Sequence, residues 1–121
     1  MGSIPSQHLR NDYQFSNYEK VKKVIVTENG AAFEDRLDHG EVNDPQRTQY
    51  LQNYIGQVHK AAEENKKVAG YFVWTFTDNF EWAEGYFPRF GLVHIDFKTQ
   101  KRTIKASGKW YRSFLKSRKF L

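Results

Sequence analysis

The chain has 121 residues, enough for one modest domain, and hydrophobic residues make up 39% of it. It contains no cysteine, which excludes disulfide frameworks and thiolate metal sites. No apolar run approaches the roughly 20 residues that cross a bilayer. The formal net charge is +5, and all the charged side chains after Asp96 are lysine or arginine. These features predict a soluble, cytoplasmic protein.

The first part of the chain contains a polar lead, a predicted strand and a polar loop. Residues 1–15 are polar and carry no sustained period, so we expect a poorly ordered lead and place the structured segment at residues 16–121. The β-branched run at 21–27 predicts a strand, which the Asn29-Gly30 pair ends with a turn. Residues 34–44 are polar and are expected to form a loop.

A helix is predicted to begin at Asp44 and Pro45. Asp44 is suited to capping free amide groups, and Pro45 suits the first helical position. Apolar residues then recur on one helical face, namely Tyr50, Leu51, Tyr54, Ile55, Val58, Ala61 and Ala62. The helix should end near residues 65–67, where cations suit its negative end.

The second half of the chain predicts two more strands and a second helix. The continuous apolar run at 68–77 indicates a strand, and residues 78–90 a loop rich in polar and aromatic residues. A short strand over 91–97 and a helix over 105–119 follow. The cations of this last segment suit either nucleic acid or the solvated face of the helix. Aromatic residues at helical spacing favour the helix face, so we expect no nucleic-acid or membrane partner.

Two apolar strands separated by a helix predict parallel pairing within an α/β fold. Sites in such folds lie at the carboxyl ends of the strands, where Glu28 and the Asp78–Trp82 segment occur. A carboxylate at Glu28 suits a nucleophile, a general acid or base, or a metal ligand. Position alone favours the simpler interpretation, in which Glu28 is an acid at a turn.

The segment from Trp74 to Trp82, WTFTDNFEW, carries the groups that bind carbohydrate. Indole faces stack on the C–H faces of sugar rings, and the Glu81 carboxylate suits vicinal hydroxyls. The alternative is an aromatic core edge with Glu81 in solvent. The four histidines are scattered and no phosphate-binding glycine loop occurs, so we expect no metal and no cofactor.

Two longer stretches carry a family resemblance. VTENGAAF, and later GYFVWTFTDNFEWAEGYFPRFGLVHIDFKTQKRTIKASGKWY, closely resemble the C-terminal part of family 1 glycoside hydrolases, the bacterial β-glucosidases. The resemblance covers about residues 16–117. It implies the last two βα units of a (β/α)₈ TIM barrel, with 24–28 as its seventh strand and 70–77 as its eighth.

The resemblance also implies roles for individual residues. The glutamate of the T-E-N-G motif, Glu28 here, would be the nucleophile of a retaining mechanism. Trp74, Glu81, Trp82 and Phe90 would bind the sugar, so the expected substrate is a β-glucoside or oligosaccharide with a terminal β-D-glucosyl residue.

The sequence departs from the family in two ways. A complete barrel needs at least about 200 residues, and the family's acid/base motif, Asn-Glu-Pro, does not occur here. We therefore expect a hydrolase fragment that is inactive alone and needs a companion barrel segment or self-association. The alternative is a sugar-binding or structural relic without catalysis.

Overall fold

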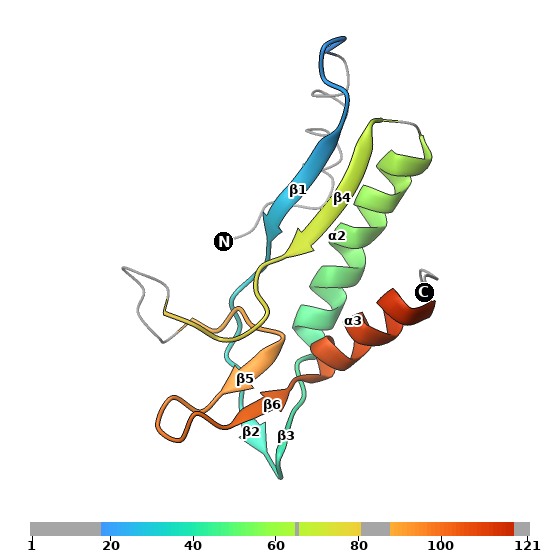
Figure 1. The fold of residues 1–121 in the computed structure, drawn as a ribbon. Coiled ribbons are helices and arrows are strands. Elements are labelled where there is room, and N and C mark those ends of the chain that lie inside the picture. Colours follow the sequence, from blue (N-terminus) through green and yellow to red (C-terminus); the bar gives the residue numbers. More distant parts are fainter. Residues whose placement is uncertain (1–17, 65, 81–87, 118–121) are drawn as a thin grey trace.

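The computed structural model describes residues 18–64, 66–80 and 88–117. Its elements follow the order β1, β2, β3, α2, β4, β5, β6 and α3 (Figure 1). The expectation of a poorly ordered lead over residues 1–15 lies outside the described residues.

Two parallel strands form the part of the fold that carries Glu28. Strand β1 (Val24–Asn29) lies beside β4 (Val68–Val73), with Val26 opposite Tyr71 and Asn29 opposite Val73. β-Branched residues at 24–27 suit this extended, partly buried ladder. The predicted parallel pairing is confirmed, and the two strands end at the same edge of the sheet.

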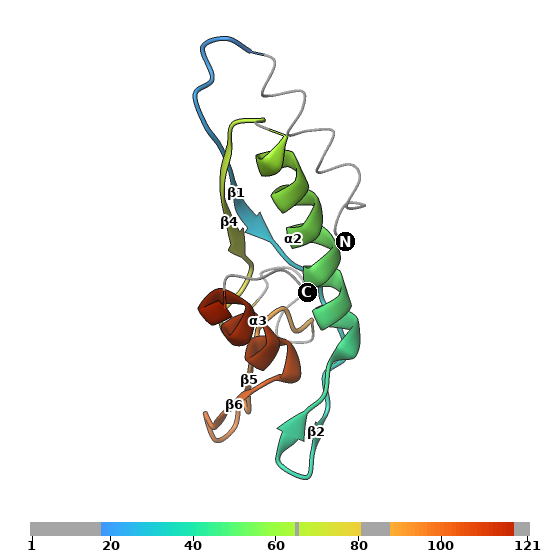
Figure 2. The ribbon, with the colours of Figure 1, turned by 90° about the vertical axis from the view of Figure 1, so that its right-hand side faces the viewer.

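Helix α2 (Pro45–Glu63) connects the two strands and covers one face of the pair (Figure 2). The predicted apolar face is the buried one, comprising Leu51, Tyr54, Ile55, Val58 and Ala61. Tyr50 is half-buried, and Ala62, which was assigned to the same face, is exposed. The helix therefore forms because a continuous apolar stripe meets the sheet.

The opposite face of the β1–β4 pair is open. Ile25 is 48% exposed and Phe72 is 61% exposed. Within the described part of the chain, β1 and β4 pair only with each other, so their outer edges carry unpaired backbone groups. A two-stranded sheet with an uncovered apolar face has the form of a section of a larger sheet.

The expected loop over 34–44 contains a small hairpin instead. Strand β2 (Leu37–Asp38) pairs antiparallel with β3 (Glu41–Val42). The two turn residues, His39 and Gly40, have φ angles of 50° and 77°. Positive φ at both turn positions matches the twist of two-residue hairpins, a signal that the polar composition concealed.

The predicted strand over 68–77 was too long. Strand β4 ends at Val73 because the chain then leaves β1: the Thr75 N–H donates to the Phe90 carbonyl, and the Leu92 N–H donates to that of Thr75. Strand β5 (Val93–Ile95) is shorter than the predicted 91–97. It pairs antiparallel with β6 (Arg102–Ile104), which we had not predicted.

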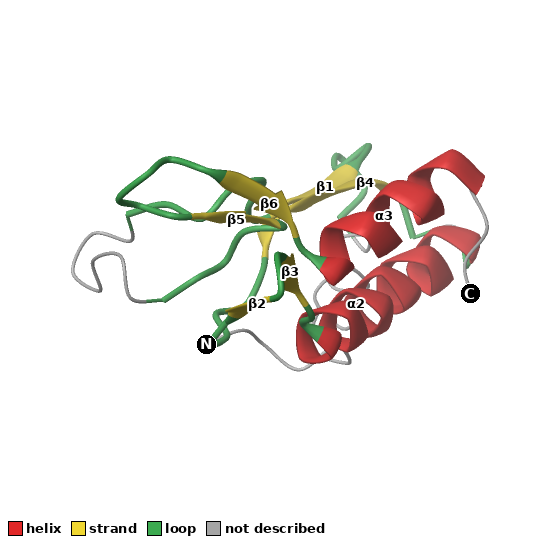
Figure 3. Ribbon diagram, turned by 90° about the horizontal axis from the view of Figure 1, so that it is seen from below, coloured by secondary structure: helices red, strands yellow, loops and turns green. Residues whose placement is uncertain are grey.

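Helix α3 (Ala106–Ser117) lies beside α2 on the same side of the molecule (Figure 3). The prediction of 105–119 began one residue early, and residues 118–119 lie outside the described residues. Among the described helices, none is long and apolar enough to cross a membrane.

Candidate active site

Glu28 is the fifth residue of β1 and is exposed, whereas its neighbour Asn29 is 7% exposed. The two side chains therefore have different surroundings at the same strand end. Asn29 accepts a hydrogen bond of 2.6 Å from the Tyr71 hydroxyl, and the Tyr50 hydroxyl donates to the Gly30 carbonyl at 3.1 Å. These bonds hold the backbone at the end of β1, whereas Glu28 is exposed.

The two tyrosines remain protonated donors at any physiological pH. Burial is the main cause that raises the pKa of Tyr50 to about 12, and the neighbouring Tyr54 adds to it. Burial likewise raises the pKa of Tyr71 far above its ordinary value. We had assigned Asn29 to a turn and Tyr71 only to a strand, because nothing local in the sequence signals their hydrogen bond.

Trp74 directly follows β4, and the backbone places it beside the end of β1. Its N–H donates to the Asn29 carbonyl at 2.9 Å. The approach is close: a Cβ on Gly30 would lie 1.8 Å from the Trp74 carbonyl oxygen. The structure thus brings Glu28 and Trp74 to one edge of the sheet.

Phe90 joins this edge through the backbone. The Phe90 carbonyl accepts the Thr75 N–H at 3.3 Å, and Phe90 is half-buried. Glu81 and Trp82, the other two predicted sugar-binding residues, lie outside the described residues. Three of the five predicted site residues are therefore gathered where β1 and β4 end.

Three carboxylates and three cations form a largely buried network, which we call the ionic network. Lys105 bridges Asp78 and Asp35 at 2.8 and 2.6 Å. The other ion pairs of the network are Arg89–Asp78, Arg47–Asp35 and Arg47–Asp44. Equal numbers of opposite charges leave the network neutral, as buried charges require.

Asp78 and Lys105 correct two expectations. Asp78 was grouped with the polar residues of the sugar-binding rim, but its side chain is 0% exposed and is paired inward. Lys105 was counted with the solvated basic tail, yet its side chain is also 0% exposed. Burial alone would raise the pKa of Asp78, but Lys105, Arg89 and the Gly91 N–H outweigh it and lower that pKa.

Asp44 does not cap its own helix, contrary to expectation. Its carboxylate makes no hydrogen bond to the amides of α2. Instead it accepts the Ser107 N–H at 2.8 Å and the Ser107 hydroxyl, in the first turn of α3. Because Arg47 also binds it, Asp44 joins the start of α2 to the start of α3.

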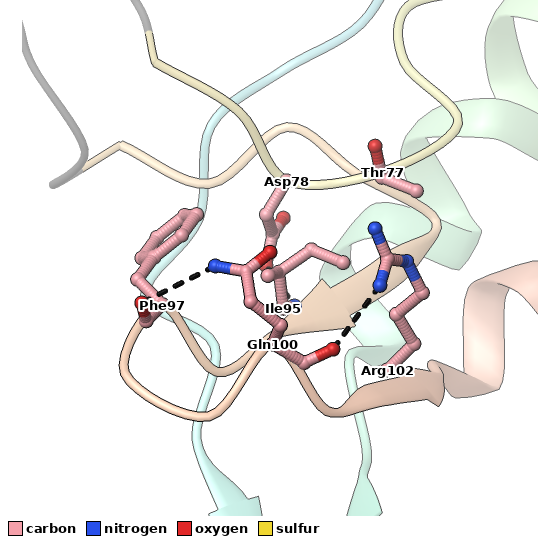
Figure 4. A pocket seen from close by; sticks show the side chains of 6 residues that line it. All are labelled: Thr77, Asp78, Ile95, Phe97, Gln100 and Arg102. Carbon is pink, nitrogen blue, oxygen red and sulfur yellow. Dashed lines mark hydrogen bonds between the residues drawn. The ribbon is translucent and has the colours of Figure 1, made fainter.

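A pocket of about 330 Å³ opens beside the β5–β6 hairpin (Figure 4). Neither Glu28, Trp74 nor Phe90 lines it; the lining residues are Thr77, Asp78, Ile95, Phe97, Gln100 and Arg102. Two of the lining polar groups are bound to neighbours, since Gln100 donates to the Phe97 carbonyl and Arg102 to that of Gln100. This pocket is separate from the edge that carries Glu28.

Known proteins are similar to this chain in sequence and fold. Residues 7–120 match the profile of glycosyl hydrolase family 1. Beta-glucosidase A of Thermotoga maritima is 52% identical over 96 residues, 78% of this chain and 22% of that protein. The beta-glucosidase of Agrobacterium sp. is 43% identical over 107 residues, 88% of this chain and 23% of that protein.

Solved structures agree with the sequence comparison. The beta-glucosidase from Thermotoga maritima in complex with glucoimidazole superimposes with a TM-score of 0.90 at 45% identity, covering 93% of this chain and 26% of that one. The chain thus spans only about a quarter of the relatives it matches. It is part of a (β/α)₈ barrel, as the resemblance implied, and it belongs to glycosyl hydrolase family 1.

Proposed function

We propose that this chain is the nucleophile-bearing C-terminal part of a retaining β-glucosidase, which hydrolyses terminal β-D-glucosyl residues. The observation that carries the proposal is the position of Glu28, exposed at the end of β1 beside Trp74, in a member of this family. Glu28 attacks the anomeric carbon as the bond to the aglycone oxygen breaks, a general acid protonates that leaving oxygen, and water then hydrolyses the glycosyl-enzyme.

The sugar is bound by Trp74, Glu81, Trp82 and Phe90 in this proposal. The backbone bonds that join Trp74 to β1 and Phe90 to Thr75 support a shared site for these two aromatic residues. An indole face and a phenyl ring cover the apolar side of a pyranose, while Glu81 and the Trp82 N–H hold its hydroxyls. Binding energy from these groups distorts and positions the ring for attack.

The acid/base catalyst comes from outside this sequence. A retaining glycosidase uses two carboxyl groups about 5–5.5 Å apart, and the sequence holds no Asn-Glu-Pro motif. The open strand edges and the exposed Ile25 and Phe72 support completion of the sheet by other strands. We propose that preceding barrel units supply both the strands and the acid, and that the 121-residue chain alone is inactive or self-associates.

The test is to complete the barrel. The chain is fused to, or co-expressed with, the part of Thermotoga maritima beta-glucosidase A that precedes the matching region; we call this product the completed barrel. Hydrolysis of an aryl β-glucoside is expected, and Glu28→Gln should abolish it, whereas Glu64→Gln, at an exposed acid after α2, should not. A folded completed barrel without activity would refute the proposal.

A second function is favoured by the missing acid/base motif. The isolated chain would be a sugar-binding or structural relic, with affinity no better than about 1 mM, equivalent to about −4 kcal/mol. Titration with glucose or cellobiose, followed by tryptophan fluorescence, distinguishes the two. Quenching by sugar in the isolated chain, together with an inactive completed barrel, would support this second function.

The cytoplasmic location also remains a proposal. The lack of cysteine in the sequence is compatible with a reducing compartment. Fractionation of the source cells, with an antibody raised against the chain, tests it: recovery in the cytosolic fraction is expected, and recovery outside the cell would refute it.

A further inference from the structure

The Asp78 carboxylate is surrounded entirely by donors. Its Oδ1 accepts from the Lys105 ammonium at 2.8 Å and from the Gly91 N–H at 3.0 Å. Its Oδ2 accepts from the Arg89 guanidinium and from the Ile95 N–H at 3.3 Å. With four donors on a fully buried side chain, the carboxylate has no direction left for a substrate hydroxyl.

These bonds continue into the predicted sugar site. Gly91 directly follows Phe90, and the Phe90 carbonyl accepts the Thr75 N–H. Thr75 directly follows Trp74, whose N–H binds the carbonyl of the residue after Glu28. Three successive backbone contacts thus link the Asp78 carboxylate to Phe90, Trp74 and Glu28.

The backbone at Gly91 packs closely against Asp78. A Cβ on Gly91 would lie 2.3 Å from the Asp78 nitrogen and 2.8 Å from its Oδ1. Only glycine fits against the Asp78 backbone at this distance, and its N–H at the same time donates to the Asp78 carboxylate.

We propose that Asp78 is a positioning residue for the sugar site: its carboxylate fixes Phe90 and Trp74 relative to Glu28 without touching the substrate. The inference rests on the proposed function and deepens it. Lys105 and Arg89 keep the carboxylate ionised and in place, so the ionic network supports the site.

The test compares Asp78→Asn with Asp35→Asn. An amide at position 78 must direct an NH₂ group at donors in either orientation, toward Arg89 and Ile95 or toward Gly91 and Lys105. Asp35 is the matched control, because its side chain is 1% exposed and also binds Lys105. Among the described residues its ion pairs go to Arg47 and Lys105, and its carboxylate does not bind Gly91 as that of Asp78 does.

The first measurement needs no activity. Hydrogen exchange is followed at the Thr75 amide in the completed barrel, and Asp78→Asn should speed it about five- to tenfold, the equivalent of one hydrogen bond. Asp35→Asn should change it less. Equal exchange at Thr75 in the two variants would overturn the inference, even if the completed barrel proves inactive.

The second measurement separates positioning from stability. For Asp78→Asn we expect kcat/KM to fall about 100-fold, as for a displacement of about 1 Å, with higher KM and weaker glucoimidazole binding. A purely structural role would lower kcat through the folded fraction and leave KM and the glucoimidazole Kd unchanged, which would overturn the inference. If Asp78→Asn does not fold, Arg89→Lys replaces it, with a smaller shift of the same Kd expected and an unchanged Kd contradicting the inference.

Discussion

At Gly30 the backbone that follows β1 closely approaches the backbone of Trp74, which follows β4. A Cβ there would lie 1.8 Å from the Trp74 carbonyl oxygen and 2.9 Å from its carbonyl carbon. Both are backbone atoms, so no side-chain rotation can relieve the contact. We predict that Gly30→Ala forces the ends of β1 and β4 apart.

The size of the effect follows from this geometry. Real Cβ contacts essentially never fall below 3.0 Å, so the backbone segments at Gly30 and Trp74 must separate by about 1 Å. Overpacking of this kind costs typically about 1–3 kcal/mol, and the rigid backbone neighbour places Gly30→Ala near about 3 kcal/mol. In the completed barrel, a displacement of about 1 Å should also lower kcat/KM by about 100-fold.

Urea unfolding of the full chain, followed by circular dichroism, measures the loss in stability. Gly70→Ala is the matched control, because it lies in the same sheet and its Cβ would meet only the Ile25 side chain, at 3.4 Å. Gly70→Ala should change the free energy of unfolding by less than about 1 kcal/mol. Equal unfolding midpoints for the two variants would refute the reasoning.

Three further predictions concern the buried polar groups. Asp44→Ala should lower the free energy of unfolding by about 3–5 kcal/mol, because it leaves the buried donors of Arg47 and Ser107 without their acceptor. Asp38→Ala, at an exposed acid, should change the urea midpoint little. Asp78 has a lowered pKa in the folded chain, so its stabilisation should be complete above about pH 4 and be lost as pH falls further; urea midpoints from pH 6 to 2 that lack this drop would contradict it. Tyr71→Phe removes the hydrogen bond to Asn29 and should cost about 1 kcal/mol by thermal unfolding, with an unchanged Tm arguing against that bond.

The sequence was sufficient to predict elements whose signal is local. The β-branched residues of β1 and the apolar stripe of α2 are visible within single windows. Strand β6 could not be predicted, because its three residues, Arg-Thr-Ile, carry no periodicity and are extended only by pairing with β5. The early end of β4 likewise depends on Phe90, far along the chain.

The site was harder to predict than the fold. Position alone favoured Glu28 as a turn acid, and the Trp74–Trp82 segment together with the family resemblance assigned it to catalysis. Most of the ionic network carries no local signal; Lys105 and Asp35, for example, are 70 positions apart. Charge runs in sequence suggest solvated surface, but Lys105 is buried because two carboxylates from distant parts of the chain, Asp35 and Asp78, bind it.

The central claim is that Glu28 is the nucleophile, and trapping the glycosyl-enzyme tests it most directly. The completed barrel is treated with a 2-deoxy-2-fluoroglucoside that has a good leaving group, and its peptides are analysed by mass spectrometry. The account predicts a fluoroglucosyl group on the peptide containing Glu28 and none in Glu28→Gln. An active completed barrel labelled at another carboxylate would contradict it.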